Sequence, residues 1–387
     1  MARNSSRHGF GGGGHPLLAT VLVVLLVAGL GVAWFQARDR VGRQADQAAG
    51  TCVAGPATVP IITSPDLAEV LGEIAKKYNA TRPVVRDHCV TVQVRPGDSK
   101  VTLDGLLGTW ESESMGARPA AWIPQSSVWA AELTTARPRA VEGDPDSLVT
   151  SPVVLAMRAA FAEKAAGKLG WGRLPELAKR PDAMAEFGLP TWGPLRLAMP
   201  LGPASDATAL AGQAIAADII RATGPLTVAE AKSPPVTGGI GAVLAAAPPA
   251  AEGTAAATVV AISKGDPRRG IHAVPITEQQ LFLLARTRKI DDDLRGFSPS
   301  GPTPVADYPV LRMSGNNITA AQSDGVAQFI EFAKQPTQIA LLTALGYRSD
   351  RAPLPTGGVI VGFAPIRDRM QRPEPAASVA LSQQVLR

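Results

Sequence analysis

The order of apolar and polar positions alternates between two periods from residue 56 onwards. The run "ATVPIIT" is typical of a buried strand, and the following "SPDLAEVLGEIAKKYNA" places apolar residues at 67, 70, 71 and 74, the spacing of an amphipathic helix. The same succession returns with the strands "CVTVQVRP" and "PAAWIP" and the helix opened by "SSVWAAELTT". Strands and helices that take turns predict a parallel sheet with helices on both faces.

The second half of the chain repeats this alternation less regularly. Strands are expected at "SLVTSPVVLAMR", "PLRLAMP", "ATVVAISKG" and "YPVLRMSG". Helices are expected at "SDATALAGQAIAADIIRATG", "PITEQQLFLLARTRK", "TAAQSDGVAQFIEFAKQ" and "PTQIALLTALGY". Residues 364–387 have no strong periodicity, and we expect no element there. The whole pattern predicts an α/β protein.

Residues 16–35 form an apolar segment without a charge. A helix of about twenty residues spans a hydrocarbon core of about 30 Å, and Trp34 and Phe35 stand at its end, where interfacial aromatics are expected. We expect a retained transmembrane anchor, with a tail at 1–15, a linker at 36–55 and the bulk of a single-pass protein outside the cytoplasm. The alternative is a cleaved signal peptide, whose apolar region usually has about 7–15 residues.

More than half of the net positive charge lies near the amino terminus. The chain has a net charge of +5, and residues 1–50 hold five Arg and two Asp, which leaves the remainder at +2. No cluster of Lys and Arg alternates with aromatic residues in the way typical of nucleic-acid-binding surfaces. We therefore expect no nucleic-acid partner.

The two cysteines, Cys52 and Cys89, each come shortly before a predicted strand. Parallel neighbours of a β-α-β unit begin at the same edge of a sheet, so the two sulfurs are expected to lie close together. An oxidising compartment favours a disulfide between them. Two separate buried thiols remain the alternative.

Several segments, taken in order, resemble a known family. They are "ITSPDLAEVLGEIAKKYN", "CVTVQV", "AAWIPQSSVWAAEL", "TSPVVLAM", "LGW", "ITEQQLF", "VADYPVLRM" and "LGYR". The series resembles the extracellular solute-binding domain of actinobacterial envelope proteins, which is similar to the type 2 periplasmic binding proteins. In many members a von Willebrand factor type A domain follows. Its Asp-x-Ser-x-Ser metal motif does not occur here, so this chain is either a short member or a truncated reading frame.

The resemblance implies two discontinuous lobes with a ligand cleft between them. The first lobe is expected at 56–148 and 264–350, the second at 149–263, and a C-terminal extension at 351–387. The implied partner is a small polar solute or an oxyanion. No cofactor is implied.

Hydroxyl groups stand where predicted strands turn into helices or cross between lobes. In open parallel sheets the crevice lies beyond the carboxyl ends of the strands, so these side chains are expected to meet there. Helix N-termini with hydroxyls suit an oxyanion or another polar solute. The candidate ligand-binding residues are Ser64, Ser126, Ser127, Ser151, Ser205 and Asp206.

A plain structural role is the alternative for each of these residues, because Ser and Asp are common helix caps. The carboxylate of Asp206 also argues against a simple oxyanion, whereas Asp66 is expected to face solvent. Trp122 and Trp129, on either side of "IPQSS", are expected to pack within the first lobe, or else to line a pocket. The acidic run at 291–293 has no glycine turn, so a calcium site is not favoured there.

No motif of a known catalytic site occurs in the sequence. Of the four histidines, only His88 and His272 follow the apolar segment, and neither has an evident catalytic partner. We therefore expect capture of a ligand by hinge closure, without chemistry and without a bound metal. The alternative is an envelope scaffold of the same fold, whose degenerate cleft contacts an envelope protein or polymer.

Overall fold

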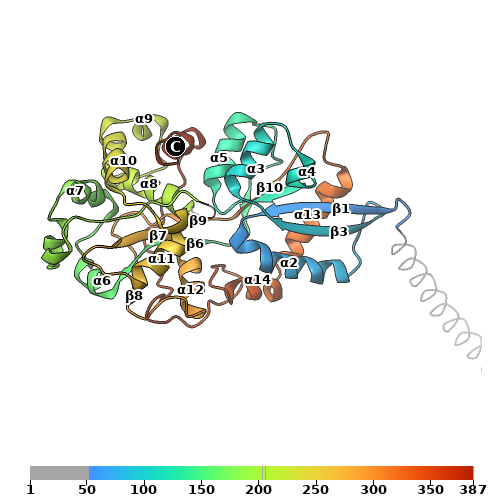
Figure 1. The fold of residues 1–387 in the computed structure, drawn as a ribbon. Coiled ribbons are helices and arrows are strands. Elements are labelled where there is room, and N and C mark those ends of the chain that lie inside the picture. Colours follow the sequence, from blue (N-terminus) through green and yellow to red (C-terminus); the bar gives the residue numbers. More distant parts are fainter. Residues whose placement is uncertain (1–51, 203, 205, 387) are drawn as a thin grey trace, which may run out of the picture.

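The computed structural model describes residues 52–386 apart from 203 and 205. Two lobes lie side by side, each built on its own sheet (Figure 1). The predicted anchor at 16–35 and the candidate Ser205 lie outside the described residues. Within the described part of the chain, no helix has the length and hydropathy needed to cross a membrane.

The first lobe contains a six-stranded sheet in the order β2-β3-β1-β4-β10-β5. Its strands β3, β1 and β4 are parallel, while β2 and β10 run antiparallel to their neighbours. The strands are β1 (Pro56–Thr63), β2 (Val84–Val85), β3 (His88–Pro96), β4 (Ala121–Ile123), β5 (Asp146–Ser147) and β10 (Pro309–Arg312). The helices are α2 (Pro65–Ala80), α3 (Ser99–Leu107), α4 (Ser112–Met115), α5 (Ser127–Ala136), α13 (Ala320–Ala333) and α14 (Pro336–Thr343).

The second lobe is built around β6, with which β7, β8 and β9 all pair antiparallel. The strands are β6 (Ser151–Arg158), β7 (Ala273–Thr277), β8 (Leu294–Phe297) and β9 (Val305–Ala306). The helices are α6 (Ala159–Ala165), α7 (Leu174–Lys179), α8 (Asp206–Ile219), α9 (Val228–Ala231), α10 (Pro234–Ala246), α11 (Ala255–Lys264) and α12 (Glu278–Arg286). Four short 3₁₀ turns lie at Trp171–Arg173, Ala183–Phe187, Pro190–Trp192 and Ala251–Gly253.

The chain passes between the lobes just after β5 and again between β9 and β10. The strands β7 and β8 at residues 273–277 and 294–297 pair with β6, whereas the sequence led us to expect a return to the first lobe at residue 264. The two sheets thus divide the chain near residues 148–150 and 307–308.

Local sequence accounts for most of these elements. In α2, residues 67, 70, 71 and 74 are all buried, and Pro65 occupies the first turn, where its missing N–H leaves no bond unmade. Thr277 opens α12 as expected, since its hydroxyl accepts a hydrogen bond of 3.2 Å from the backbone N–H of Gln280.

Three segments differ from the prediction. The strand expected at residues 194–200 is reduced to one isolated bridge between Leu197 and Ala273. Residues 255–264 form α11 and not a strand, because Thr254 caps a helix whose buried residues lie on one helical face. Residues 375–385 form α15 (Pro375–Val385), a helix that the sequence did not lead us to expect. This last helix lies between the lobes, next to α5 on one side and α9 on the other (Figure 1).

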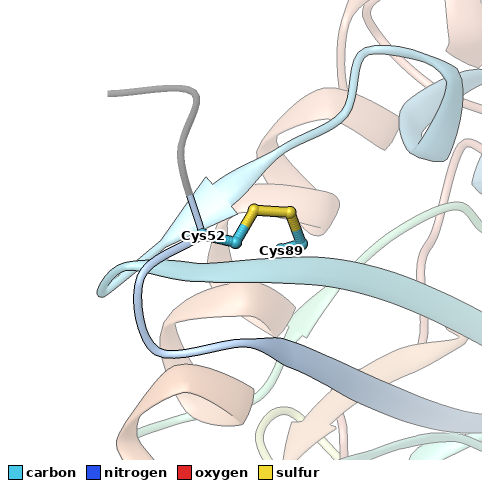
Figure 2. The surroundings of a disulfide bond; sticks show 2 residues. All are labelled: Cys52 and Cys89. Carbon is cyan, nitrogen blue, oxygen red and sulfur yellow. A yellow bond between two sulfur atoms is a disulfide. The ribbon is translucent and has the colours of Figure 1, made fainter. Parts of the chain in front are cut away.

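The disulfide between Cys52 and Cys89 is confirmed (Figure 2). Its two Cα atoms are 5.1 Å apart. Cys89 pairs with Pro56 in the register of β1 and β3, so the bridge joins the start of β1 to its parallel neighbour.

Candidate functional site

Two regions of the junction between the lobes hold the polar residues singled out from the sequence. The first, called here the α5 side, contains α5, α8 and α15. The second, called here the α2 side, contains the first turns of α2 and α12. Those predicted ligand-binding residues that the structure describes divide between these two regions.

On the α5 side, the carboxylate of Asp206 from the second lobe contacts two donors of the first lobe. Its Oδ2 accepts hydrogen bonds from the Ser126 hydroxyl at 2.7 Å and from the Trp129 indole N–H at 2.8 Å. Its backbone N–H donates to Gln125 at 3.2 Å. Burial raises the pKa of Asp206 to about 7, against the opposing effect of these hydrogen bonds.

Ser127 binds a second carboxylate at the same helix end. Its backbone N–H and hydroxyl donate to Asp307 at 2.7 and 2.6 Å, and the Arg372 guanidinium pairs with the same side chain at 2.5 Å. The N-terminus of α5, which we expected to face an oxyanion, therefore already contacts two carboxylates of the chain. An exogenous anion would have to displace them.

The helix α15 completes the α5 side. It packs against α5 of the first lobe and against α8, α9 and α10 of the second. At Gly212 of α8, a Cβ atom would lie 2.6 Å from Val385, so only glycine allows the two helices to approach this closely. Gln213 adds a buried hydrogen bond of 3.0 Å to Ser378. A cavity of about 680 Å³ remains between α5, α8 and residues 369–378.

On the α2 side, Ser64 is buried but its hydroxyl has no hydrogen-bond partner and does not cap α2. The neighbouring Asp66 points inward and not to solvent, contrary to our expectation. Its Oδ2 accepts hydrogen bonds from Gln125 at 3.0 Å and from the Tyr308 hydroxyl at 2.5 Å. The Tyr347 hydroxyl donates to its backbone oxygen at 2.9 Å.

Both tyrosines are protonated donors in this arrangement. Burial, together with the nearby Asp66 charge, raises the pKa of Tyr308 and of Tyr347 well above 10. Their rings meet edge to face with centroids 5.2 Å apart. Through their two hydrogen bonds, the tyrosines therefore hold the side chain and the backbone of Asp66 in place in the first turn of α2.

A cavity of about 730 Å³ opens between the two lobes on the α2 side. The first lobe contributes α2 and α14, and the second contributes α11 and α12. Its lining is Asp66, Glu69, Val70, Glu73, Lys77, Ala256, Gln279, Gln280, Leu283, Leu284, Thr287, Lys289, Leu341 and Leu345. We name it the α2/α12 cavity.

The first turn of α12 supplies the polar residues that the sequence reasoning missed. Gln279 is fully buried, and neither its amide oxygen nor its amide nitrogen has a partner. Its backbone N–H donates to the Ser151 hydroxyl at 3.0 Å, so Ser151 supports this turn from the start of β6. The letters "TEQQ" directly after a strand were the available signal, because they place two amides in a first helical turn.

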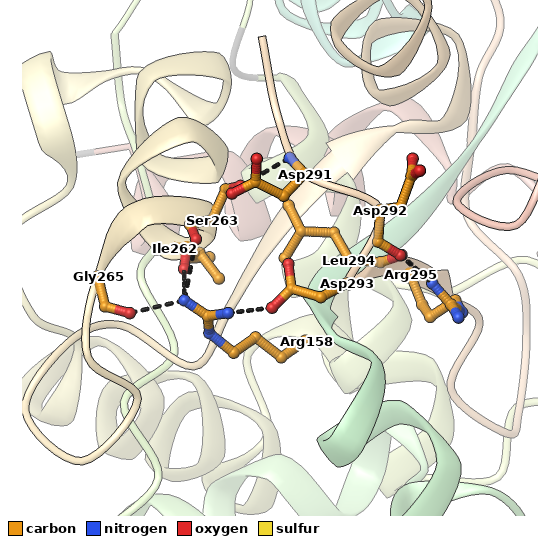
Figure 3. A network of polar contacts seen from close by, with 9 residues as sticks. All are labelled: Arg158, Ile262, Ser263, Gly265, Asp291, Asp292, Asp293, Leu294 and Arg295. Carbon is orange, nitrogen blue, oxygen red and sulfur yellow. Dashed lines mark hydrogen bonds and ion pairs between the residues drawn. The ribbon is translucent and has the colours of Figure 1, made fainter. Parts of the chain in front are cut away.

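The acidic run at 291–293 is tied to its own lobe (Figure 3). Asp293 pairs with Arg158, whose guanidinium also donates to carbonyl oxygens at the end of α11, including that of Gly265 at 2.6 Å. Asp291 accepts a hydrogen bond of 3.0 Å from Ser263. These contacts close the C-terminus of α11 and give the run a structural role.

His272 also has a structural role. Its ring contacts the Arg196 guanidinium and the Pro267 carbonyl, both at 2.8 Å, and Trp192 lies against it with ring centroids 5.2 Å apart. Burial lowers the pKa of His272 to about 4, so the ring is neutral near pH 7. It is part of a loop anchor within the second lobe.

Comparisons with known proteins agree with this architecture. Residues 59–348 match the family described as bacterial extracellular solute-binding protein. Uncharacterised proteins from two strains of Mycobacterium tuberculosis, H37Rv and CDC 1551 / Oshkosh, are each 37% identical over 338 residues, which are 86% of this chain and 48% of theirs. The chain thus spans about half the length of the curated relatives it matches.

Solved structures show the same fold at low sequence identity. The ferric binding protein from Campylobacter jejuni has a TM-score of 0.58 at 11% identity, covering 84% of this chain and 97% of that protein. Iron-bound HitA from Pseudomonas aeruginosa has a TM-score of 0.55 at 12% identity, covering 85% and 97%. The predicted two-lobed fold of the periplasmic-binding-protein type is confirmed.

Proposed function

Because this chain belongs to the bacterial extracellular solute-binding protein family, we propose that it captures a small polar solute between its lobes without converting it chemically. The observation that carries this proposal is the α2/α12 cavity of about 730 Å³, whose walls come from both lobes. Ligand sites in proteins have this size and occur where two lobes or domains meet. A solute held there contacts both lobes at once.

Under this proposal, some of the candidate residues contact the solute directly, and others support the residues that do. Asp66, Gln279 and Gln280 line the cavity, while Ser64 immediately precedes α2 and Ser151, in β6, accepts a hydrogen bond from the backbone of Gln279. Ser126, Ser127 and Asp206 act on the other side of the junction, where they join the lobes. Their proposed role is to set the spacing of the lobes.

We propose that the protein works outside the cytoplasm and is held at the membrane by residues 16–35. The disulfide of Cys52 supports an oxidising compartment, and the family is named for extracellular proteins. The apolar segment precedes this disulfide in the sequence, so an anchor there leaves both lobes on the outer side.

Ferric iron is not the ligand we propose, although one protein of the same fold is described as a ferric binding protein and another as iron-bound. A hard trivalent cation needs anionic oxygen ligands. On the α2 side Tyr308 and Tyr347 remain protonated and donate to Asp66, so they are unsuited to that role.

A cavity-blocking variant tests capture directly. Ala256→Trp places a bulky ring in the cavity wall, and Val101→Trp on the exposed face of α3 is the matched control. In calorimetric and thermal-shift screens of the detergent-solubilised chain against sugars, amines, amino acids and oxyanions, we expect a solute that raises the Tm of the parent chain and of Val101→Trp. Ala256→Trp is expected to lose that response. A response that survives in Ala256→Trp contradicts capture in this cavity.

An envelope scaffold is the second candidate function, and the position of α15 favours it. This helix packs on both lobes, which restricts the hinge motion that capture uses. If the scaffold role holds, no solute of the screen alters the Tm, and α15 remains protected from hydrogen exchange under all conditions. A solute-dependent change in exchange at α2 and α12 contradicts it.

A further inference from the structure

The inner end of the α2/α12 cavity, defined by Asp66, Gln279 and Gln280, has buried polar atoms without partners. These atoms are Asp66 Oδ1, Gln279 Oε1, Gln279 Nε2 and Gln280 Oε1. Buried polar atoms in folded proteins are almost always hydrogen-bonded, and each one left without a partner destabilises the fold. One of these atoms belongs to α2 and three belong to α12, on facing walls of the cavity, and we take them as the groups that a captured solute contacts.

The neighbouring contacts fix what kind of partner is missing. Asp66 Oδ2 already accepts two hydrogen bonds, so only its Oδ1 is left. The amide nitrogen of Gln280 donates at 3.1 Å to the carbonyl oxygen of Ala204, which can only accept, so its Oε1 must point elsewhere. Gln279 offers one oxygen and one NH₂ group. The inner end therefore presents three acceptors and one donor group, and one acceptor belongs to a carboxylate.

We infer that the captured solute carries a protonated primary amine on an aliphatic body, an inference that rests on the proposed function. An ammonium group has three N–H donors and no acceptor, so it can pair with the three free acceptor oxygens, while the NH₂ group of Gln279 is left to water. The cavity walls beside this end are apolar and suit an aliphatic chain; they are Val70, Ala256, Leu283, Leu284, Leu341 and Leu345. An oxyanion presents only acceptors and would face the carboxylate of Asp66.

The charges along the cavity agree with this orientation. The N-termini of α2 and α12 carry positive partial charge; Asp66 in the first turn of α2 offsets it there, whereas Glu278 in the first turn of α12 is paired with Arg348 at 2.7 Å. Glu69 follows Asp66 on the cavity face of α2. Lys77 lines the opposite end, about 16 Å along the helix from Asp66 at 1.5 Å per residue, so it lies too far away to repel an ammonium group at the inner end.

Titration calorimetry of the full chain in detergent tests the inference with three probes: butylamine, sorbitol and inorganic phosphate. We expect butylamine to bind and the other two not to bind. Asp66→Asn removes the charge and keeps an oxygen acceptor, and we expect it to weaken butylamine binding by at least about tenfold, the usual effect of losing one charge-assisted hydrogen bond.

A second variant separates a binding role from a structural one. Gln279→Met keeps the volume of the side chain but removes the unpartnered amide, so we expect a higher Tm without solute and at least about tenfold weaker butylamine binding. Gln335→Met, at an exposed position before α14, is the matched control and is expected to leave both quantities unchanged. A structural role alone would not produce a higher Tm together with weaker binding.

The possible outcomes separate this inference from the proposed function. Binding of sorbitol or phosphate that Ala256→Trp abolishes, with butylamine inactive, overturns the amine inference and leaves capture in place. Butylamine binding that Asp66→Asn and Gln279→Met leave unchanged also overturns it. If neither these probes nor any member of the wider screen binds, both proposals fall.

Discussion

The two sides of the junction between the lobes treat the serines named from the sequence differently, although Thr208 Oγ1 and Gln384 Oε1 on the α5 side also have no partner. On the α5 side, each of the hydroxyls of Ser126 and Ser127 donates to a carboxylate, and α15 covers the contact from both lobes. On the α2 side, a cavity separates the lobes, and the Ser64 hydroxyl, one oxygen of Asp66 and the Gln279 amide have no partner.

This difference indicates a division of labour within one junction. Satisfied buried networks give a defined geometry, whereas unsatisfied ones store free energy that a ligand can release. The α5 side thus fixes how the lobes meet, and the α2 side remains able to respond. We therefore expect the lobes to move relative to each other mainly at the α2 side, while the contacts of the α5 side stay in place.

The largest expected effect contrasts leucines on the two sides. Leu381 of α15 is fully buried, so Leu381→Ala should lower the free energy of unfolding by about 3 kcal/mol. Leu283 only borders the α2/α12 cavity, and Leu283→Ala should cost less than about 1 kcal/mol because the cavity already exists there. Urea unfolding measures both values, and equal losses would contradict the contrast.

The next effect depends on pH and concerns Asp206. Its pKa is about 7 in the folded chain and 3.8 in a free side chain, so the folded state keeps a proton that the unfolded state releases. The resulting stabilisation is complete below about pH 4 and is lost as the pH rises through 7. From pH 5 to 7 we expect the parent chain to lose about 2 kcal/mol relative to Asp206→Asn.

The comparison with Asp206→Asn isolates this effect from that of His272. The lowered pKa of His272 acts in the opposite direction, since its contribution is lost as the pH falls from 6.5 to about 4. It is present in both proteins and cancels in the difference. Parallel stability curves for the two proteins would show that Asp206 is ionised in the fold throughout.

The smallest effect compares two serines at equivalent helix starts. Ser126→Ala removes a donor from the buried carboxylate of Asp206 and should lower the free energy of unfolding by about 1–2 kcal/mol. Ser64→Ala removes a hydroxyl without a partner, so we expect a change within about 0.5 kcal/mol of zero, or a slight gain. Chemical unfolding again measures both, and a loss above about 1 kcal/mol in Ser64→Ala would reveal a partner for its hydroxyl.

The elements that could be predicted from the sequence are those with a local signal. The Ser-Pro-Asp start of α2 and its apolar spacing determine that helix without help from the rest of the chain. The strand expected at 257–265 was wrong because "TVVAI" is rich in β-branched residues. Its buried positions 255, 258, 259 and 262 nevertheless follow a helical period, which the tertiary structure uses.

The site was less predictable because its contacts join distant segments. Ser126 and Asp206 were both named from the sequence as ligand contacts. Nothing in the local sequence indicates that the carboxylate of Asp206 contacts the N-terminus of α5, where we expected an anionic ligand. Asp66 and Gln279 line the same cavity only because α2 of one lobe faces α12 of the other. Cys52 and Cys89 were the exception, since Cys52 shortly precedes β1 and Cys89 lies at the start of β3, its parallel neighbour.

The disulfide has a mechanical consequence for a tethered protein. Any pulling force that enters the chain ahead of Cys52 reaches β3 through the sulfur bridge as well as β1 through the backbone. The two neighbouring strands β1 and β3 then share the load. Tension therefore cannot separate β1 from β3 one residue at a time, starting at Pro56. Reducing agents should therefore lower the force at which this lobe unravels in a single-molecule stretching experiment.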